Sequence, residues 1–250
     1  MNEFVVVIPA RYASERLPGK PLRRIAGKLL VQHVYECALE SDAREVILAT
    51  DDSRIEQAAA EFGAPVCMTG IYHSSGTDRL AEVSRVRNWP DDLVIVNLQG
   101  DEPLMPAELI NDCAALLQSG AVDMATLASP IASPADFKDP NVVKVIVDSN
   151  GDAIYFSRAA IPYSRNPDTE QLAMHTALHH HGIYAYRTEV LQRIVATRRS
   201  PLEESEQLEQ LRAIDMGIRI RVGRPARRPG PGVDTEADLA KVERLIVAGA

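Results

Sequence analysis

The chain has 250 residues, 46% hydrophobic and 25% charged, so it can bury a globular core without disulfides or metals as staples. Its net charge of −8 argues against general nucleic-acid or anionic-membrane binding, which needs a broad basic surface. The three cysteines are far apart and form no C-x-x-C pair, which predicts free thiols in a reducing compartment.

The first half of the chain alternates short apolar runs with amphipathic stretches. The run at 4–8 is too short for a signal sequence or a membrane span, so we expect a cytoplasmic protein without membrane insertion. Continuous apolar runs predict strands covered on both faces, and apolar side chains three or four residues apart predict helices. The expected elements are strand 4–8, helix 29–39, strand 46–49, a helix from 53 to about 62, a helix from 75, strand 93–98 and helix 106–117.

The second half is less regular. Two expected strands, 142–147 and 153–156, flank the hairpin sequence Ser-Asn-Gly-Asp at 149–152. Strands alternating with helices favour an α/β fold with a mostly parallel sheet, and no linker or repeat divides the chain. We therefore predict one domain, 1–250, with a β-rich insertion. Its remaining elements are strand 180–186, helix 203–212, strand 218–222, an irregular segment at 224–232 and helix 235–247.

A cluster of cations follows the first predicted strand. Arg11, Arg16 and Lys20 lie within ten residues, where they repel one another unless something negative sits among them. Pro21 stands where a Walker A loop needs Ser or Thr, and no G-x-G-x-x-G occurs. A turn at Gly19, a nearby helix start and three cations fit a polyphosphate. The alternative is a solvated basic loop with surface ion pairs.

Two aspartates are expected beside this loop. Asp101 follows strand 93–98, so it shares the rim where ligands bind in open parallel sheets. A carboxylate facing a polyphosphate is repelled unless a divalent cation lies between them, which makes Asp101 a candidate Mg²⁺ ligand. Asp234, after the glycine-rich turn at 230–232, is the second candidate. An aspartate before a helix is also a common N-cap, and that alternative stays open.

Seven motifs together carry a family resemblance. They are PARYASERLPGKP, SGTDRLAE, NLQGDEP, YFSRAAIP, HGIYAYR, SPLEESEQLEQLR and GVDTEADL, in order along nearly the whole chain. The chain resembles the 3-deoxy-manno-octulosonate cytidylyltransferase family (CMP-Kdo synthetases). The first motif is shared by many sugar nucleotidyltransferases, whereas the set is specific. The resemblance implies a single Rossmann-like nucleotidyltransferase domain: 1–130 mainly binds CTP, 131–230 mainly binds sugar and forms a dimer, and 231–250 is a closing turn and helix.

The resemblance also implies a reaction. The anomeric hydroxyl of 3-deoxy-D-manno-octulosonate (Kdo) attacks the α-phosphorus of CTP, giving CMP-Kdo and diphosphate and activating Kdo for lipopolysaccharide biosynthesis. The implied cofactor is Mg²⁺, held by Asp101 and Asp234, and the implied assembly is a homodimer. Such a transfer needs positioning and charge neutralisation more than covalent help. The implied catalytic residues are Arg11, Lys20, Asp101 and Asp234.

The remaining site residues are transferred motif by motif. The CTP-binding set is Arg11, Arg16, Lys20, Ser75, Gly76, Thr77, Arg79 and Gln99. The sugar-binding set is Gln99, His180, Tyr184, Glu209 and Gln210, to which we add Arg158 because a substrate carboxylate favours a bidentate cation. A capped helix start also explains Ser75 and Thr77. Of the three consecutive histidines at 179–181, only His180 matches the family, and neighbours in a strand point to opposite faces.

Two other functions are considered. A cytidylyltransferase for a related acid, an 8-amino-Kdo or a sialic-type sugar, would share the CTP loop and differ around 155–212. A non-catalytic nucleotide-binding regulator is expected to have lost Lys20, Asp101 or Asp234, and all three are present.

Overall fold

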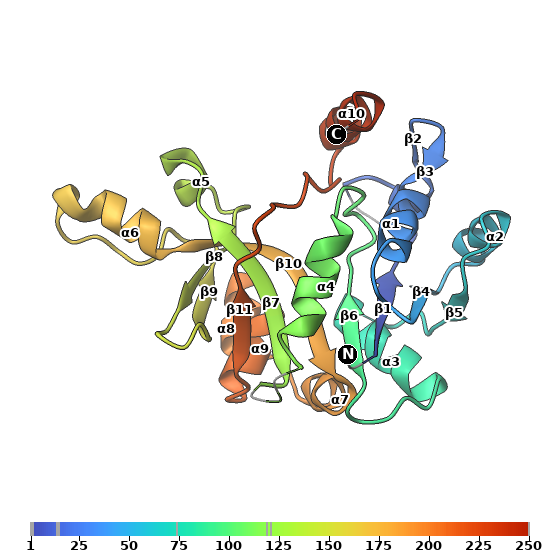
Figure 1. Cartoon of the computed structure of the whole chain (residues 1–250), viewed down its shortest axis with the longest axis horizontal. Coiled ribbons are helices and arrows are strands. Elements are labelled where there is room, and N and C mark those ends of the chain that lie inside the picture. Colours follow the sequence, from blue (N-terminus) through green and yellow to red (C-terminus); the bar gives the residue numbers. More distant parts are fainter. Residues whose placement is uncertain (1–2, 14–15, 74, 119, 121, 250) are drawn as a thin grey trace.

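One twisted sheet organises the molecule (Figure 1). The computed structural model describes residues 3–13, 16–73, 75–118, 120 and 122–249. The strands are β1 (Phe4–Pro9), β2 (Arg24–Ile25), β3 (Lys28–Leu29), β4 (Glu45–Thr50), β5 (Val66–Met68), β6 (Val94–Asn97), β7 (Met124–Pro130), β8 (Lys144–Val147), β9 (Ala153–Ser157), β10 (Leu178–Arg187) and β11 (Ile220–Gly223). The helices are α1 (Leu30–Leu39), α2 (Ser53–Glu61), α3 (Gly76–Val86), α4 (Ala107–Ala115), α5 (Pro134–Lys138), α6 (Glu170–Thr176), α7 (Thr188–Ala196), α8 (Pro201–Glu206), α9 (Gln210–Asp215) and α10 (Glu236–Val247), with 3₁₀ turns at Lys20–Leu22 and Pro167–Thr169.

The sheet is mostly parallel, as expected. Its main path runs β11-β7-β10-β6-β1-β4-β5, and β8 and β9 branch from it at β10. Strands β6, β1, β4 and β5 pair in parallel, and β11 is parallel to β7. Only β10 is antiparallel to both of its neighbours on this path in the described part of the chain. The α/β prediction is therefore confirmed, with one reversed strand at the centre.

Helices cover both faces of the sheet, which explains the unbroken apolar run of β1. Phe4, Val6 and Ile8 belong to a buried cluster with α1 and α4. Val5 and Val7 belong to a second cluster with α3 and α7 on the opposite face. Because successive side chains of a strand point to opposite faces, a strand buried on both sides has no polar position.

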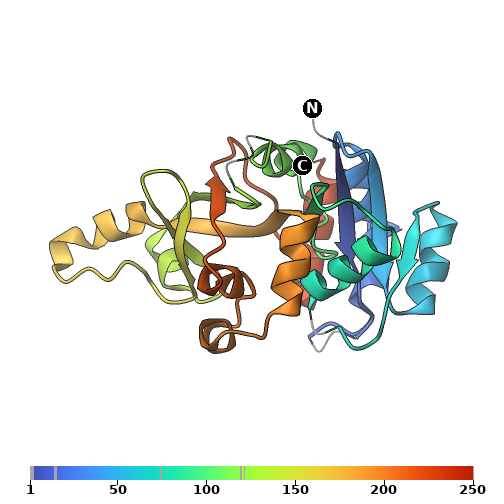
Figure 2. The same cartoon turned by 90° about the horizontal axis from the view of Figure 1, so that it is seen from below.

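Part of the second half projects from the body as an arm, which we define as α5, β8, β9, α6 and the first residues of β10 (Figures 1 and 2). It has a small core of its own, formed by Ile131, Phe137, Ala173 and Ala177. Asp148 accepts hydrogen bonds from the backbone N–H groups of Asn150 (2.8 Å) and Asp152 (2.9 Å), which closes the predicted hairpin. The arm is the expected β-rich insertion, with two helices added.

The sequence-based elements differ from the structure in several places. The single helix predicted at 203–212 is wrong: Gln207 is left-handed (φ 53°) and separates α8 from α9. The strands β2, β3, β5 and β7 and the helices α5, α6 and α7 were not predicted. None of the described helices has the length and apolar composition that a bilayer crossing requires.

Candidate functional site

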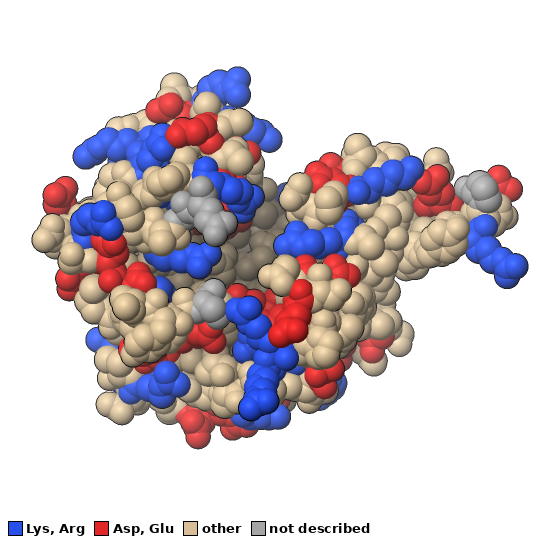
Figure 3. All heavy atoms as spheres, turned by 180° about the vertical axis from the view of Figure 1, so that it is seen from behind, with Lys and Arg blue, Asp and Glu red and all other residues tan. Residues whose placement is uncertain are grey.

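The candidate site is a cleft at the carboxyl ends of β1 and β6. Figure 3 shows a hollow on this face with basic side chains around it. Two adjoining pockets make up the cleft, of about 820 and 510 Å³. Every candidate residue named from the sequence lines one of them. The residues common to both are Arg16, Gly76, Gln99, Asp101, Glu209 and Asp234.

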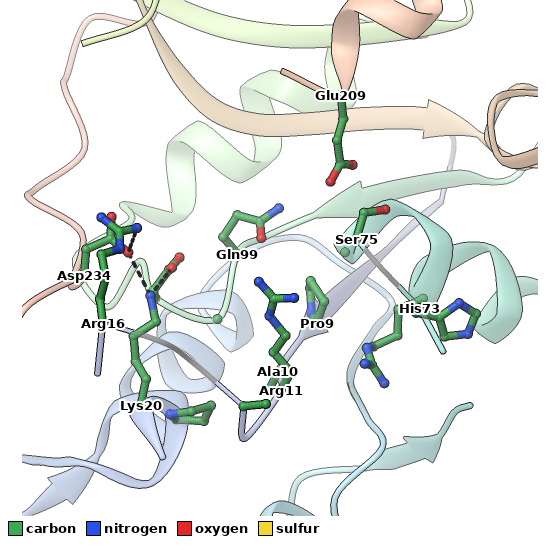
Figure 4. Close-up of a pocket in the computed structure, with 16 residues that line it drawn as sticks. Pro9, Ala10, Arg11, Arg16, Lys20, His73, Ser75, Gln99, Glu209 and Asp234 are labelled. Atoms are coloured by element: carbon green, nitrogen blue, oxygen red, sulfur yellow. Dashed lines mark hydrogen bonds and ion pairs between the residues drawn. The ribbon is translucent and has the colours of Figure 1, made fainter. Parts of the chain in front are cut away.

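The basic loop reaches the first pocket through a tight turn. Gly19 has φ 66°, which favours glycine, and its N–H donates to the carbonyl oxygen of Tyr12 at 3.2 Å. A Cβ at Gly19 would lie 3.2 Å from the Tyr12 ring. The turn therefore directs the next residue, Lys20, into the cleft, and Figure 4 shows Arg11 pointing into the same space.

Lys20 is the centre of a charged cluster. Its Nζ donates to Asp101 Oδ2 (2.5 Å), the Val233 carbonyl oxygen (2.9 Å) and Asp234 Oδ1 (3.0 Å), so all three ammonium protons have acceptors (Figure 4). The side chain is 15% exposed. Burial alone opposes the charged form, but the carboxylates of Asp101 and Asp234 outweigh it, and the pKa of Lys20 is raised. Lys20 is thus charged at neutral pH.

Asp234 does not cap a helix. The N-cap of α10 is Thr235, which forms a capping box with Asp238. The Asp234 carboxylate instead accepts from Lys20 and from Arg16 Nη2, at 2.9 Å. The N-cap alternative for Asp234 is therefore excluded.

The carboxylates outnumber the buried cation beside them. Desolvation, reinforced by the charges of Asp101 and Asp234, raises the pKa of Glu102 to about 8. A Cβ at Gly232 would lie 2.8 Å from Glu102 Oε1, so glycine lets the Asp234 turn approach. Asp101 and Asp234 converge on one ammonium group, a position a divalent cation can share. The described residues contain no cluster of three or more His, Cys, Asp or Glu side chains that could hold a metal ion.

A buried arginine lies near the start of α3 and lines the first pocket. Arg79 is 3% exposed, and it pairs with Asp51 Oδ2 at 3.2 Å and with Thr69 Oγ1. Ser75 is the N-cap of α3, accepting from the Asp78 N–H at 3.1 Å, so the capping explanation holds for Ser75. Thr77 has another role: its hydroxyl donates to Glu209 Oε2 at 2.5 Å and links the two pockets.

The second pocket contains buried polar atoms that lack partners. Tyr184 Oη and Gln210 Nε2 have no hydrogen-bond partner among the described residues. Buried polar atoms are nearly always satisfied, so these two indicate a polar ligand or water in the pocket. Arg158, from the end of β9, lines the same space. Its Nε and Nη1 donate to backbone carbonyl oxygens, and no described residue accepts from Nη2.

The three histidines separate as the strand geometry predicts. A register shift in β10 lies between His180 and Tyr184, and His180 lines the second pocket. Its Nε2 lies 3.0 Å from Thr126 Oγ1. Burial, with smaller contributions from His181 and His179, lowers the pKa of His180 to about 3, so it is neutral. The rings of His179 and His181 pack against each other with centroids 5.2 Å apart.

Several lining residues were missed from the sequence, and His73 and Asn97 are two polar examples. His73 lines the first pocket and contacts Glu82; it precedes Ser75 by two positions, a location with no chemical signature. Asn97, the last residue of β6, lines the second pocket and accepts from Gln99 Nε2 at 3.2 Å. Its place at a strand's carboxyl end is the signal that could have identified it.

Sequence comparison with known proteins identifies the family of this chain. The cytidylyltransferase family model matches residues 5–220. The chain is 49% identical to the 3-deoxy-manno-octulosonate cytidylyltransferase of Xanthomonas oryzae pv. oryzae, covering 98% of this chain and 97% of that protein. It is 50% identical to the protein of the same name from Cellvibrio japonicus, covering 98% and 99%. The chain belongs to the 3-deoxy-manno-octulosonate cytidylyltransferase family.

Solved structures agree with this family. A CMP:2-keto-3-deoxy-manno-octonic acid synthetase complexed with CTP has a TM-score of 0.91 and 46% identity, covering 99% of this chain and 100% of that chain. A cytidylyltransferase from Leptospira borgpetersenii shares only the fold, with a TM-score of 0.64 and 16% identity, covering 99% and 87%. The fold therefore extends beyond the 3-deoxy-manno-octulosonate cytidylyltransferase family.

Proposed function

We propose that the protein transfers CMP from CTP to the anomeric hydroxyl of Kdo, releasing diphosphate and activating Kdo for lipopolysaccharide biosynthesis. The observation that carries this proposal is the pair of adjoining pockets: one is rich in cations, and the other has orphaned buried polar atoms. Full-length relatives near 50% identity carry the name of this activity, and one structural relative was solved with CTP. A related sugar acid is the alternative substrate.

The first pocket is proposed to hold the triphosphate. Arg11, Arg16 and Lys20 supply three positive charges from one loop, and no described residue pairs with Arg11. Fixed charges that need no reorganisation stabilise the charge that develops on the departing diphosphate. Ser75, Gly76, Thr77, Arg79 and Gln99 complete the proposed CTP site.

Asp101 and Asp234 are proposed to hold Mg²⁺. Their oxygens converge within hydrogen-bonding distance of a single atom, Lys20 Nζ, so they can share one small cation. When bound, Mg²⁺ would neutralise phosphate charge and polarise the phosphoryl oxygens. Lys20 stays beside the carboxylates as a second positive charge, and its ammonium orients both of them.

The second pocket is proposed to hold the sugar acid. Arg158 is suited to its carboxylate, and Tyr184 and Gln210 offer unpaired polar atoms to its hydroxyls. Neutral His180 can donate or accept a hydrogen bond there. Glu209 and Gln99 lie at the junction of the pockets, where the hydroxyl nucleophile and the α-phosphate would meet.

We further propose a homodimer formed through the arm and a cytoplasmic location. Leu172 on α6 and Tyr163 in the loop before it are 64% and 87% exposed, so a second chain can cover these apolar side chains. Cys37, Cys67 and Cys113 are free thiols, as expected in the reducing compartment where CTP is made.

Diphosphate release tests the activity. CTP, ATP, GTP and UTP are each assayed with Kdo, 8-amino-Kdo and N-acetylneuraminate at saturating Mg²⁺, and with Mn²⁺ or Ca²⁺ in its place. We expect the CTP and Kdo pair to exceed the other combinations by about 10²-fold or more. If another acid gives faster diphosphate release, that acid is the substrate in place of Kdo. If no pair gives diphosphate release, the non-catalytic regulator is favoured.

A further inference from the structure

Lys144, the first residue of β8, is a buried cation outside the machinery described so far. Its side chain is 0% exposed and is among the largest fully buried side chains. Its Nζ donates to the carbonyl oxygens of Val142 (2.6 Å), Arg158 (2.7 Å) and Asp139 (2.8 Å). All three ammonium protons are used on backbone oxygens. An apolar residue would avoid the cost of burying this charge, so the three contacts need an explanation.

The contacts join segments that lie beyond the end of the β8–β9 ladder. The pairing of β8 with β9 ends at Lys144 opposite Ser157. Val142 lies before β8 and Arg158 lies after β9, and Val143 and Arg158 line the second pocket. The ammonium group of Lys144 links Val142 and Arg158 where the ladder hydrogen bonds have stopped.

The same loop also holds the side chain of Arg158. Arg158 Nη1 donates to the Pro140 carbonyl oxygen at 3.1 Å, within the 139–142 segment that Lys144 binds. Arg158 Nε donates to the Glu206 carbonyl oxygen at 2.9 Å, and the Arg158 N–H donates to Glu206 Oε2 at 2.9 Å. Lys144 therefore acts on Arg158 in two ways. It binds the backbone carbonyl oxygen of Arg158, and it binds the loop whose Pro140 carbonyl oxygen orients the Arg158 guanidinium.

We propose that Lys144 is a positioning residue for substrate binding: its ammonium group fixes the 139–142 loop and Arg158 so that Arg158 meets the carboxylate of the sugar acid. This inference rests on the proposed function, because it assigns Arg158 to that carboxylate. It predicts that Lys144 affects sugar-acid binding and leaves nucleotide binding alone.

A double-mutant cycle tests the coupling. Lys144→Met removes the ammonium group and keeps the chain length. We expect the KM for Kdo to rise about 10-fold or more, while the calorimetric Kd for CTP changes by less than about two-fold. In an Arg158→Met background, the same change should add less than about two-fold to the KM, because the residue it positions is gone.

Multiplicative effects on the KM for Kdo would overturn the proposal, as would equal losses for Kdo and CTP. Lys138→Met is the matched control, because Lys138 directly precedes the 139–142 segment but is exposed and forms a surface pair with Glu170. The wild-type enzyme separates the two hypotheses: if it does not turn over Kdo, the proposed function fails before any variant is compared.

A measurement on the unmodified protein covers the case in which Lys144→Met does not fold. The chain has five lysines, so amine dimethylation is readily followed at each site by mass spectrometry. Labelling is compared for free enzyme, enzyme with α,β-methylene-CTP, and enzyme with that analogue and saturating Kdo.

We expect Kdo to slow labelling of Lys144 about five-fold or more, because a bound carboxylate holds Arg158 and closes the local opening that exposes the amine. The nucleotide analogue alone should slow Lys20 and leave Lys144 within about two-fold. Lys138 should label equally in all three states. An unchanged Lys144 rate with bound Kdo would overturn the proposal.

Discussion

Lys20 joins two parts of the chain in which charges of like sign repel one another. The loop that contains it concentrates cations, and the turns that contain Asp101, Glu102 and Asp234 concentrate carboxylates. Repulsion between like charges destabilises each group alone. Contact between the Lys20 ammonium and the carboxylates reduces the repulsion in both groups, because each group then lies beside charge of the opposite sign. The metal-free fold is therefore more dependent on Lys20 than on an exposed surface cation.

Lys20→Met should reveal this dependence. Without the ammonium group the carboxylates repel one another, so the free energy of unfolding without metal should fall by about 1–3 kcal/mol. Mg²⁺ should stabilise the variant more than the wild type, since it restores positive charge between the same oxygens. Turnover should fall by about 10²-fold or more.

Denaturant unfolding in EDTA and in Mg²⁺, together with diphosphate release, provides the check. Arg23→Met is the control, because Arg23 forms an exposed pair with Glu236 that should contribute no more than about 1 kcal/mol. Equal stability of the Lys20 variant and the wild type in EDTA would contradict the expected repulsion.

The sequence motifs identified which residues lie close together in the site, but not which side chains pair with one another. Arg11, Lys20 and Asp101 could be assigned to one rim because strand ends share an edge, and Asp234 was added because it follows a glycine-rich turn. Their pairing depends on side-chain geometry that a linear pattern does not contain. Asp234 and the neighbouring Thr235 are both residue types that cap helices, and the structure gives that role to Thr235.

Strand β10 is the element that gives the second pocket most of its character. It is the reversed strand, and its irregular register places His180 and Tyr184 in the pocket. Burial lowers the pKa of His180 to about 3 and that of His181 to about 4. An unfolded histidine has a pKa near 6.5. Between that pH and the lower folded pKa, the unfolded chain therefore binds protons that the folded chain does not.

Stability should therefore fall on acidification. The folded pKa values lie below the unfolded value, so the contribution is complete above about pH 6.5 and decreases as the pH falls toward the folded values. Each histidine contributes a slope of about 1.4 kcal/mol per pH unit once its unfolded form is protonated.

Urea unfolding between pH 8 and pH 4.5 measures the slope, and His181→Gln should lower it by one proton. The same replacement at exposed His175 is the matched control. A slope unaffected by His181→Gln would show that this ring is protonated in the fold.

Elements were predictable where burial leaves a clear pattern. β1, β4 and β6 are runs of large apolar residues, and each was found near its predicted bounds. β7 was missed because it is filled with small residues, Ala125, Thr126, Ala128 and Ser129, which are buried by their neighbours and not by their own hydrophobicity. The break at Gln207 was missed because no Gly or Pro marks it, and the residues around it retain a helical spacing.

The arm gives the whole molecule an asymmetric shape with apolar side chains far from the main core (Figure 2). Leu172→Asp places a charge on the exposed face of α6, so it should convert the proposed dimer into a monomer. Light scattering should give about twice the 27.4 kDa chain mass for the wild type and one chain mass for the variant.

Leu39→Asp is the control, because Leu39 is also an exposed leucine but lies on α1, outside the arm. Its mass should match the wild type. A wild-type mass of one chain, or a Leu172 variant that stays a dimer, would show that the arm is not the interface.

Lys20 and Asp234 are paired although 214 positions separate them in the chain, so the pair cannot form until long after Lys20 has been synthesised. At about 5–20 residues per second, Asp234 is added roughly 10–40 s after Lys20. During that interval Leu17, Ile25 and Leu30 lack the cover that Val233 and Val242 provide in the finished protein. A nascent chain on the ribosome can thus pair Lys20 with Asp101 but has only half of the carboxylate pair. We therefore expect a chain that ends before Asp234 to be inactive, because it lacks one of the two carboxylates proposed for the site.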